Sequence, residues 1–166
     1  MTSPSVDFQP IAEELIASLR DAVGSVAEER LYLLAVSAFS MDETRDFVRM
    51  LLDGGGIQTV ALSESRVVGW CDVVQNRHEG TRHGATLGMG VVREFRHRGI
   101  GSELLRRTLD AAKLKGIERV ELEVFSSNQG AIELYERSGF LREGCKRRAR
   151  ILDNLETDIV LMAKFL

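Results

Sequence analysis

The stretch Val91-Val92-Arg93-Glu94-Phe95-Arg96-His97-Arg98-Gly99-Ile100-Gly101-Ser102 joins an apolar strand to a helix through a basic turn that contains two glycines. Glycine allows a tight backbone turn, so several amide N–H groups and the first turn of the next helix can point at one anion. Four basic side chains add positive charge around that point, namely Arg93, Arg96, His97 and Arg98. The stretch therefore predicts a turn that binds pyrophosphate between a strand and a helix.

Two well-known phosphate loops do not match this part of the chain. The dinucleotide fingerprint G-x-G-x-x-G, begun at Gly88, would need its third glycine where Arg93 stands. A Walker loop needs a Gly-Lys pair after a suitable glycine, and the sequence has none. The remaining pattern is R-x-x-G-x-G from Arg96 to Gly101, which alone also fits an ordinary glycine-bearing helix start.

Length and composition predict a single domain over residues 1–166. A chain of 166 residues with 44% hydrophobic residues can bury one substantial core and is short for two. The formal net charge of −3 is small, and the basic residues are not gathered in a tail. These features argue against a generic nucleic-acid binder, so we expect no nucleic-acid partner.

The cysteines and the apolar segments bear on metal content and location. Cys71 and Cys145 are far apart and each lies in a strand-like segment, so we expect free thiols and no metal. Residues 1–5 lack a charged region followed by an apolar run, and no apolar stretch of about 18 residues follows. We therefore expect a soluble, cytoplasmic protein that does not bind a membrane.

The first third of the chain is predicted to be mostly helical. A short strand and three helices are expected, at 6–8, 10–23, 27–38 and 41–52. Pro10 suits the first turn of the first helix, and Gly24 interrupts its pattern. Ser40 and Glu43 have the S-x-x-E spacing of a capping box at the start of the third helix.

From residue 57 onward, strands alternate with helices. Six strands are expected, at 57–62, 66–74, 81–92, 120–125, 140–151 and 156–166. Helices are expected at 102–115 and 128–138. The strand–helix–strand order makes 81–92 parallel to 120–125 through a right-handed crossover. We predict an α/β (α+β) fold with a mixed central sheet of about six or seven strands flanked by helices.

Asn128 and Tyr135 are seven residues apart, so they share one face of a helix. That helix begins near the C-terminal end of strand 120–125, where ligands usually bind in sheets with a parallel segment. In strand 81–92, Gly88 and Gly90 mark a bulge or the close approach of a ligand. Together these positions indicate one ligand groove.

The motifs also occur in a familiar order. Arg96-x-x-Gly99-x-Gly101, then Leu122-Glu123-Val124, then the run from Asn128 to Phe140 resemble the acyl-CoA half of the GCN5-related N-acetyltransferase (GNAT) superfamily. The resemblance covers residues 81–141 well, the C-terminal strands moderately and the first 55 residues only in layout. It implies the GNAT fold, with strands 81–92 and 120–125 splayed apart at the acyl-CoA site, and acetyl-CoA as cosubstrate with no metal.

The resemblance also implies roles for single residues. Val91 and Val92 would offer backbone groups to pantetheine, with Met89 and Gly90 beside the acetyl group. Asn128 would hydrogen-bond the pantetheine arm, and Tyr135 would protonate the departing thiolate as the catalytic acid. The pyrophosphate would be held by Arg96, His97, Arg98, Gly99, Ile100, Gly101 and Ser102.

The catalytic base is less constrained. Glu123 matches a glutamate that has this role in the ribosomal-protein N-terminal acetyltransferase branch, and a partly buried carboxylate there could have a raised pKa. The alternatives are that Glu123 pairs with a nearby arginine or faces water, that Glu121 on the same side acts instead, or that a water relay carries the proton. Thr86 stands where related bacterial branches carry a glutamate. Further candidates for substrate contacts are Asp72, His78 and His83.

We expect an N-acetyltransferase that passes an acetyl group directly from acetyl-CoA to a primary amine of a small molecule or protein. A covalent route is disfavoured because Cys71 and Cys145 lie away from the groove motifs and lack an evident activating base. One alternative is a non-catalytic acyl-CoA-binding or regulatory module. Another is an interaction domain that uses a basic hairpin, formed by Lys146, Arg147, Arg148 and Arg150. The acceptor's identity is open, and a homodimer is compatible with the sequence.

Overall fold

Seven strands form one mixed sheet in residues 5–166, the part of the chain that the computed structural model describes. Residues 1–4, which the expected domain includes, lie outside this range. The strands are β1 (Asp7–Pro10), β2 (Gly56–Ser63), β3 (Arg66–Gln75), β4 (Gly84–Val91), β5 (Arg119–Phe125), β6 (Leu141–Leu152) and β7 (Leu155–Phe165), in the spatial order β1-β2-β3-β4-β5-β7-β6. The helices are α1 (Ile16–Ala27), α2 (Met41–Met50), α3 (Ile100–Leu114) and α4 (Gln129–Arg137).

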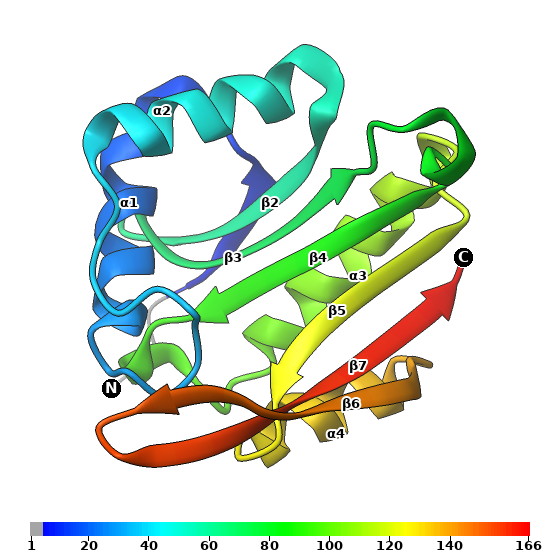
Figure 1. The fold of residues 1–166 in the computed structure, drawn as a ribbon. Coiled ribbons are helices and arrows are strands. Elements are labelled where there is room, and N and C mark those ends of the chain that lie inside the picture. Colours follow the sequence, from blue (N-terminus) through cyan, green and yellow to red (C-terminus); the bar gives the residue numbers. More distant parts are fainter. Residues whose placement is uncertain (1–4) are drawn as a thin grey trace.

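The helices cover both faces of the sheet, with α1 and α2 on one face and α3 and α4 on the other (Figure 1). The apolar side chains along one side of α3, Leu104, Leu105, Leu109 and Ala112, are all buried. On the opposite face, Val26 of α1 and Val48 of α2 join a second buried cluster with Trp70. Burial of these apolar side chains on both faces explains why the sheet is stable as a central layer.

The parallel pair that the sequence predicts is confirmed. β4 and β5 pair only from Gly84 with Arg119 to Thr86 with Glu121, although both strands continue beyond these residues. They then separate toward their C-terminal ends (Figure 1). Their facing backbone edges are thereby available to something other than a neighbouring strand.

The capping box at the start of α2 is also confirmed. The Glu43 N–H donates to Ser40 Oγ at 3.1 Å, and the Ser40 N–H donates to Glu43 Oε2 at 2.8 Å. These two bonds satisfy backbone donors that the helix itself leaves unpaired. The helix therefore begins where the sequence predicted.

The predictions for the first two helices are partly wrong. Pro10 ends β1, paired with Thr59, and does not begin a helix. α1 continues through Gly24 and ends at Ala27. The glycine is needed for close packing, since a Cβ at position 24 would lie 2.7 Å from the Cβ of Ala38. No helix forms at 27–38 after Ala27.

Residues 28–40, which we call the strap, cross the end of the sheet as an irregular segment. Arg30 has a left-handed backbone, with φ of 60°, and its guanidinium pairs with Asp153 at 2.8 Å. Arg20 Nε donates to the Phe39 carbonyl at 2.8 Å. These long-range contacts outweigh the helical spacing of apolar residues within the strap, where Leu31 and Leu34 are exposed instead of buried.

Candidate active site

A groove of about 1330 Å³ opens where β4 and β5 separate. It brings together most of the residues that the sequence predicts for the site. These are Val91, Arg96, His97, Gly99, Gly101, Ser102, Glu123, Asn128 and Tyr135. Met89 and Gly90 line it as well. Val92, Arg98 and Ile100 are outside the lining.

The basic turn ends in the N-terminus of α3. His97 and Gly99 have φ of 60° and 77°. Gly99 is the N-cap residue, so α3 begins at Ile100, two positions earlier than expected. No side chain caps the helix, so its first amide N–H groups can face the groove. Ile100 is 4% exposed and packs in the core, which anchors the turn. The turn has the geometry of an anion site.

Arg96 and Arg93 do not point their charge at that site. Arg96 Nη1 donates to Glu29 Oε2 at 3.0 Å, its Nε donates to the Val91 carbonyl at 2.8 Å, and its guanidinium lies 4.6 Å from the Tyr32 ring centroid. Arg93 reaches the same Glu29 carboxylate at 3.1 Å. Hydrogen bonding from Arg96 lowers the pKa of Glu29. Both arginines therefore contact the strap, and the other basic side chains of the turn are His97 and Arg98.

Both backbone groups of Val92 form hydrogen bonds within the protein. Its N–H donates to the Val68 carbonyl and its carbonyl accepts from the Phe95 N–H, both at 3.0 Å. Backbone groups that could meet a ligand on this strand therefore come from the stretch Gly88–Val91, which lines the groove.

Asn128 and Tyr135 share the groove-facing side of α4, as predicted. Asn128 caps the helix by accepting the Ala131 N–H at its Oδ1, at 3.3 Å. Tyr135 is 7% exposed, and its ring lies 5.7 Å from that of Phe140. Burial raises the pKa of the Tyr135 phenol above its ordinary value, so it stays protonated at neutral pH.

The two acidic residues of β5 line the groove, and the side chain of each is close to half exposed. The Glu123 side chain is 41% exposed and pairs with Lys146 on the adjacent hairpin. The Glu121 side chain is 47% exposed and pairs with Arg119 at 3.0 Å. Because Lys146 belongs to β6, this pairing depends on how the C-terminal hairpin folds back over β5.

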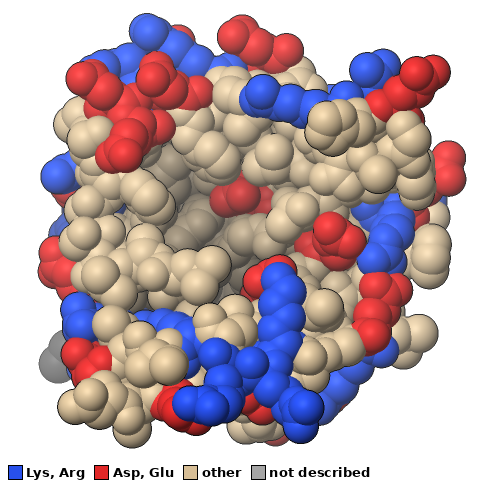
Figure 2. Space-filling view, viewed as in Figure 1, with Lys and Arg blue, Asp and Glu red and all other residues tan. Residues whose placement is uncertain are grey.

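A second cavity, of about 510 Å³, lies between the sheet and helices α1 and α2, and we call it the side chamber. Its lining is Leu19, Arg20, Val23, Leu33, Leu34, Ala35, Phe39, Glu43, Thr44, Phe47, Gln58, Trp70, Asp72, Gly88 and Met89. Four of these, Leu33, Leu34, Gly88 and Met89, also line the groove, so the two cavities adjoin. The face in Figure 2 is hollowed at its centre, with uncharged walls and an acidic group at the floor.

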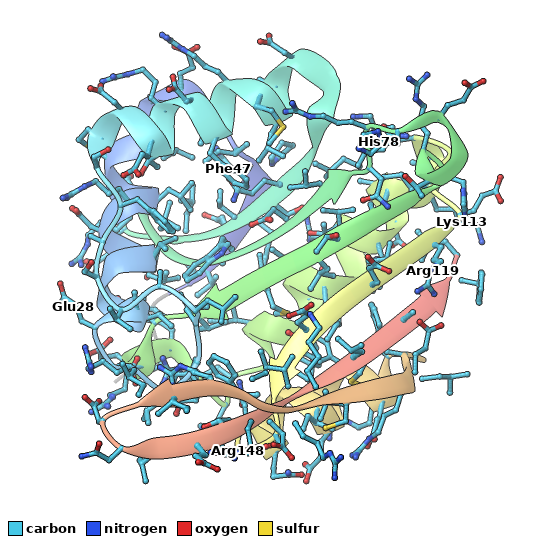
Figure 3. The ribbon with its side chains drawn as sticks, viewed as in Figure 1. Glu28, Phe47, His78, Lys113, Arg119 and Arg148 are labelled. Atoms are coloured by element: carbon cyan, nitrogen blue, oxygen red, sulfur yellow. The ribbon has the colours of Figure 1, made fainter. Side chains whose placement is uncertain are left out.

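Asp72 is the one of the three further substrate-contact candidates that the fold brings to a cavity. It is 9% exposed, and burial raises its pKa to about 7 although Gln58 Nε2 donates to its Oδ1 at 3.3 Å. His78 and His83 are exposed and outside both linings. Figure 3 shows His78 in the connection between β3 and β4.

Trp70 belongs to the core, and it accounts for one glycine of β4. The ring is 5% exposed and packs directly against Gly90, where any Cβ would clash with it. Gly88 faces Asp72 instead, since a Cβ there would lie 3.3 Å from Asp72 Oδ2. The close approach that the glycines signal is thus made by neighbouring side chains of β3.

Sequence reasoning missed Gln58, Glu29 and Tyr32. Gln58 reaches Asp72 because β2 and β3 pair these two residues directly. Glu29 and Tyr32 reach Arg96 because the strap crosses the turn. Partners so far apart in the sequence leave no local motif.

Three further observations concern the cysteines, possible metal ligands and helix lengths of the described residues. Both cysteines are free, Cys71 being buried and Cys145 exposed, and burial raises the pKa of the Cys71 thiol. Residues 5–166 contain no group of three or more histidine, cysteine, aspartate or glutamate side chains arranged to hold a metal ion. Within the same range, no helix combines the length and apolarity needed to cross a membrane.

Comparison with known proteins gives the family. Residues 14–140 match the acetyltransferase (GNAT) family. The sequence is 36% identical over 84 residues to N-alpha-acetyltransferase 30 of Schizosaccharomyces pombe, covering 50% of this chain and 56% of that protein. It is 30% identical over 116 residues to the L-amino acid N-acetyltransferase AaaT of Escherichia coli, covering 69% of this chain and 72% of that protein. The match thus spans little more than half the length of the first relative.

The fold agrees with solved structures. A phosphinothricin acetyltransferase from Sinorhizobium meliloti, solved in complex with acetyl-CoA, has a TM-score of 0.90 to this structure. The comparison covers 97% of this chain and 88% of that one, at 17% sequence identity. The predicted mixed sheet with its splayed parallel pair is therefore confirmed as a fold.

Proposed function

This chain belongs to the GNAT acetyltransferase family, and we propose that it transfers an acetyl group from acetyl-CoA directly to a primary amine of a small molecule or protein. One observation carries the proposal. A single groove joins the N-terminus of α3, the separated edges of β4 and β5, and the Asn128–Tyr135 face of α4. These are an anion site, free backbone groups and a proton donor, in the order in which acetyl-CoA presents pyrophosphate, pantetheine and thioester.

The residues present fit acetyl-CoA. The uncapped amides of α3 and the left-handed turn at His97 and Gly99 can bind the pyrophosphate. Asn128 uses its side-chain oxygen in the helix cap, so its side-chain nitrogen keeps donors for a pantetheine carbonyl. When bound, acetyl-CoA supplies an activated carbonyl carbon and a thiol leaving group.

Tyr135 is the proposed acid. The amine nitrogen first bonds to the carbonyl carbon, the carbon–sulfur bond then breaks, and Tyr135 gives its proton to the departing sulfur. Backbone N–H groups of β4 can stabilise the oxyanion that forms between these steps. The proton that the nitrogen loses as the intermediate collapses returns to the Tyr135 oxygen, so the enzyme ends unchanged.

Glu123 is the proposed base, which removes the first proton from the ammonium form of the acceptor and releases it to solvent. Its support is position, since the carboxylate lines the groove on β5. Glu121 lines the same groove, so Glu123→Gln and Glu121→Gln should be compared by the pH dependence of kcat/KM. A shifted profile only in Glu121→Gln moves the role to Glu121, and unshifted profiles in both leave a water relay.

The experiment for the function itself has two readouts. Isothermal titration with acetyl-CoA tests binding, and release of free thiol with a panel of primary amines tests transfer. Binding without amine-dependent thiol release would favour a non-catalytic acyl-CoA-binding module. Failure to bind acetyl-CoA would contradict both readings.

A further inference from the structure

We propose that the side chamber is the acceptor site, and that it selects a compact primary amine with an apolar body, whose nitrogen binds Asp72 and Gln58 at the chamber floor. This inference rests on the proposed acetyl transfer and adds the class of acceptor. The support comes from the floor, the walls and the boundary with the groove.

The chamber floor contains a buried oxygen that could accept a hydrogen bond from a ligand. Gln58 is 3% exposed, and among the described residues its Oε1 is a buried oxygen without a hydrogen-bond partner. Its Nε2 bonds to Asp72 Oδ1, so the unsatisfied oxygen and the carboxylate lie together on paired residues of β2 and β3. A buried acceptor without a donor is costly, and an amine supplies two or three donors at once.

The walls disfavour acceptors that carry a second charged group in addition to the amine. Leu19, Val23, Leu33, Phe39 and Phe47 present apolar groups to the chamber. Phe47 lies on the side of α2 that faces the sheet (Figure 3). Burying an acceptor's carboxylate or second ammonium against such walls would cost its hydration without a compensating partner.

Two charged side chains besides Asp72 line the chamber, and both make contacts elsewhere. Arg20 of α1 donates to the Phe39 carbonyl and pairs with Asp21 at 3.2 Å. Glu43 of α2 holds the capping box with Ser40. The chamber therefore lacks, among the residues described, a free cation for the carboxylate of an amino acid, which argues for an amine without that group.

The boundary places the nitrogen where transfer could occur. Asp72 pairs with Gly88, and Asp72 Oδ2 lies 3.3 Å from where a Gly88 Cβ would be. Gly88 and Met89 line both cavities. Thr86 and Glu121 are partners in the parallel pair, and residues two positions apart on a strand point to the same face of the sheet. Gly88, its partner Asp72, and Glu123 therefore share that face.

The test compares three probes that share one body: 2-phenylethylamine, phenylalanine and 2-phenylethanol. With saturating acetyl-CoA, 2-phenylethylamine should be acetylated with a kcat/KM at least tenfold above that of phenylalanine. Thermal shift should show binding of the amine but not of the alcohol, which lacks the charge. Equal or better use of phenylalanine, or of spermidine or a peptide N-terminus, would overturn the assignment of acceptor class.

Variants test the floor. Asp72→Asn should raise KM for 2-phenylethylamine about tenfold to a hundredfold, the scale of a lost charged hydrogen bond, with the acetyl-CoA dissociation constant unchanged. Gln58→Leu should raise that KM severalfold and provides an independent variant if Asp72→Asn does not fold. Asp46→Asn makes the same chemical change at an exposed site on α2 and should leave KM unchanged.

An unaltered KM in folded Asp72→Asn or Gln58→Leu would overturn the assignment of the floor. The proposed function fails separately, by an absence of acetyl-CoA binding in the wild-type protein. Acetyl-CoA binding with transfer to other amines alone would keep the function and reject the chamber as its acceptor site.

Discussion

The groove and the side chamber adjoin along β4 but are built in opposite ways. The groove takes most of its lining from one continuous region, from Thr86 to Tyr135, on β4, α3, β5 and α4. The chamber collects side chains from α1, the strap, α2, β2, β3 and β4. Under the proposed assignment, the donor is bound by a motif of fixed spacing, whereas the acceptor is bound by side chains that only the tertiary fold brings together.

Electrostatics separate the two regions as well. In the groove, the side chains of Glu121 and Glu123 are partly exposed and each has a basic partner. In the chamber, Asp72 is buried with the amide of Gln58 as its neighbour. The first arrangement suits a charged ligand in contact with water, and the second suits a single cation brought out of water.

The largest expected effect is on the groove side. Tyr135→Phe should lower kcat by about a hundredfold to ten-thousandfold, because the departing sulfur loses its proton donor. The acetyl-CoA dissociation constant should stay the same, since the ring still fills its place in the core. Steady-state kinetics with calorimetry makes the measurement, and an unchanged kcat would remove Tyr135 as the acid.

A large effect on stability is expected from the chamber. The folded pKa of Asp72, about 7, is above its unfolded value near 3.8, so the folded state binds more protons between these two values. The contribution of Asp72 to stability therefore falls as pH rises from about 4 to 7, by roughly 4 kcal/mol at about 1.4 kcal/mol per pKa unit. Asp72→Asn should gain stability over wild type across this range, as measured by urea unfolding. A constant difference between the two proteins would contradict the raised pKa.

Two glycines with similar backbones allow an effect on acetyl-CoA binding at the turn to be distinguished from an effect of backbone strain on stability. Gly99 and Gly116 both have left-handed backbones, with φ of 77° and 85°, and a Cβ at either would meet nothing within 4 Å. Replacing either glycine with valine should lower the free energy of unfolding by about 1–3 kcal/mol. Gly99→Val should also weaken acetyl-CoA binding by about tenfold or more, because it distorts the amides that form the anion site. Equal affinities in the two variants would reject the turn as that site.

The smallest effect is expected at the strap. Glu29→Gln weakens the half-buried contacts with Arg96 and Arg93, and should cost about 1–2 kcal/mol at neutral pH. The pKa of Glu29 is lowered on folding, so this stability is present above its unfolded pKa and is lost as pH falls through the folded value. Glu28→Gln is the control, since Glu28 points outward at the start of the strap (Figure 3). Equal midpoints for the two variants at pH 7 would show that the ion pairs do not hold the strap.

Local signals explain what could be predicted. The capping box at Ser40, the shared face of Asn128 and Tyr135, and the parallel pair of strands each depend on residues close in sequence or on connection rules. The strap could not be predicted from its apolar residues at helical spacing in 27–38. Its conformation is set instead by contacts with Arg96 and Asp153, which lie far along the chain. For the same reason Arg96 was expected at a phosphate and is found on Glu29, and nothing in the sequence marks Gln58 as the neighbour of Asp72.

One measurement tests direct transfer in the groove most closely. The protein is mixed with acetyl-CoA, with and without an amine, then quenched and analysed by mass spectrometry of both protein and small molecules. We expect an unmodified protein in both samples, and one N-acetylated amine for each free thiol when amine is present. An acetylated protein that passes its acetyl group to amine in a second step, or acetyl-CoA left intact with every amine, would contradict the mechanism.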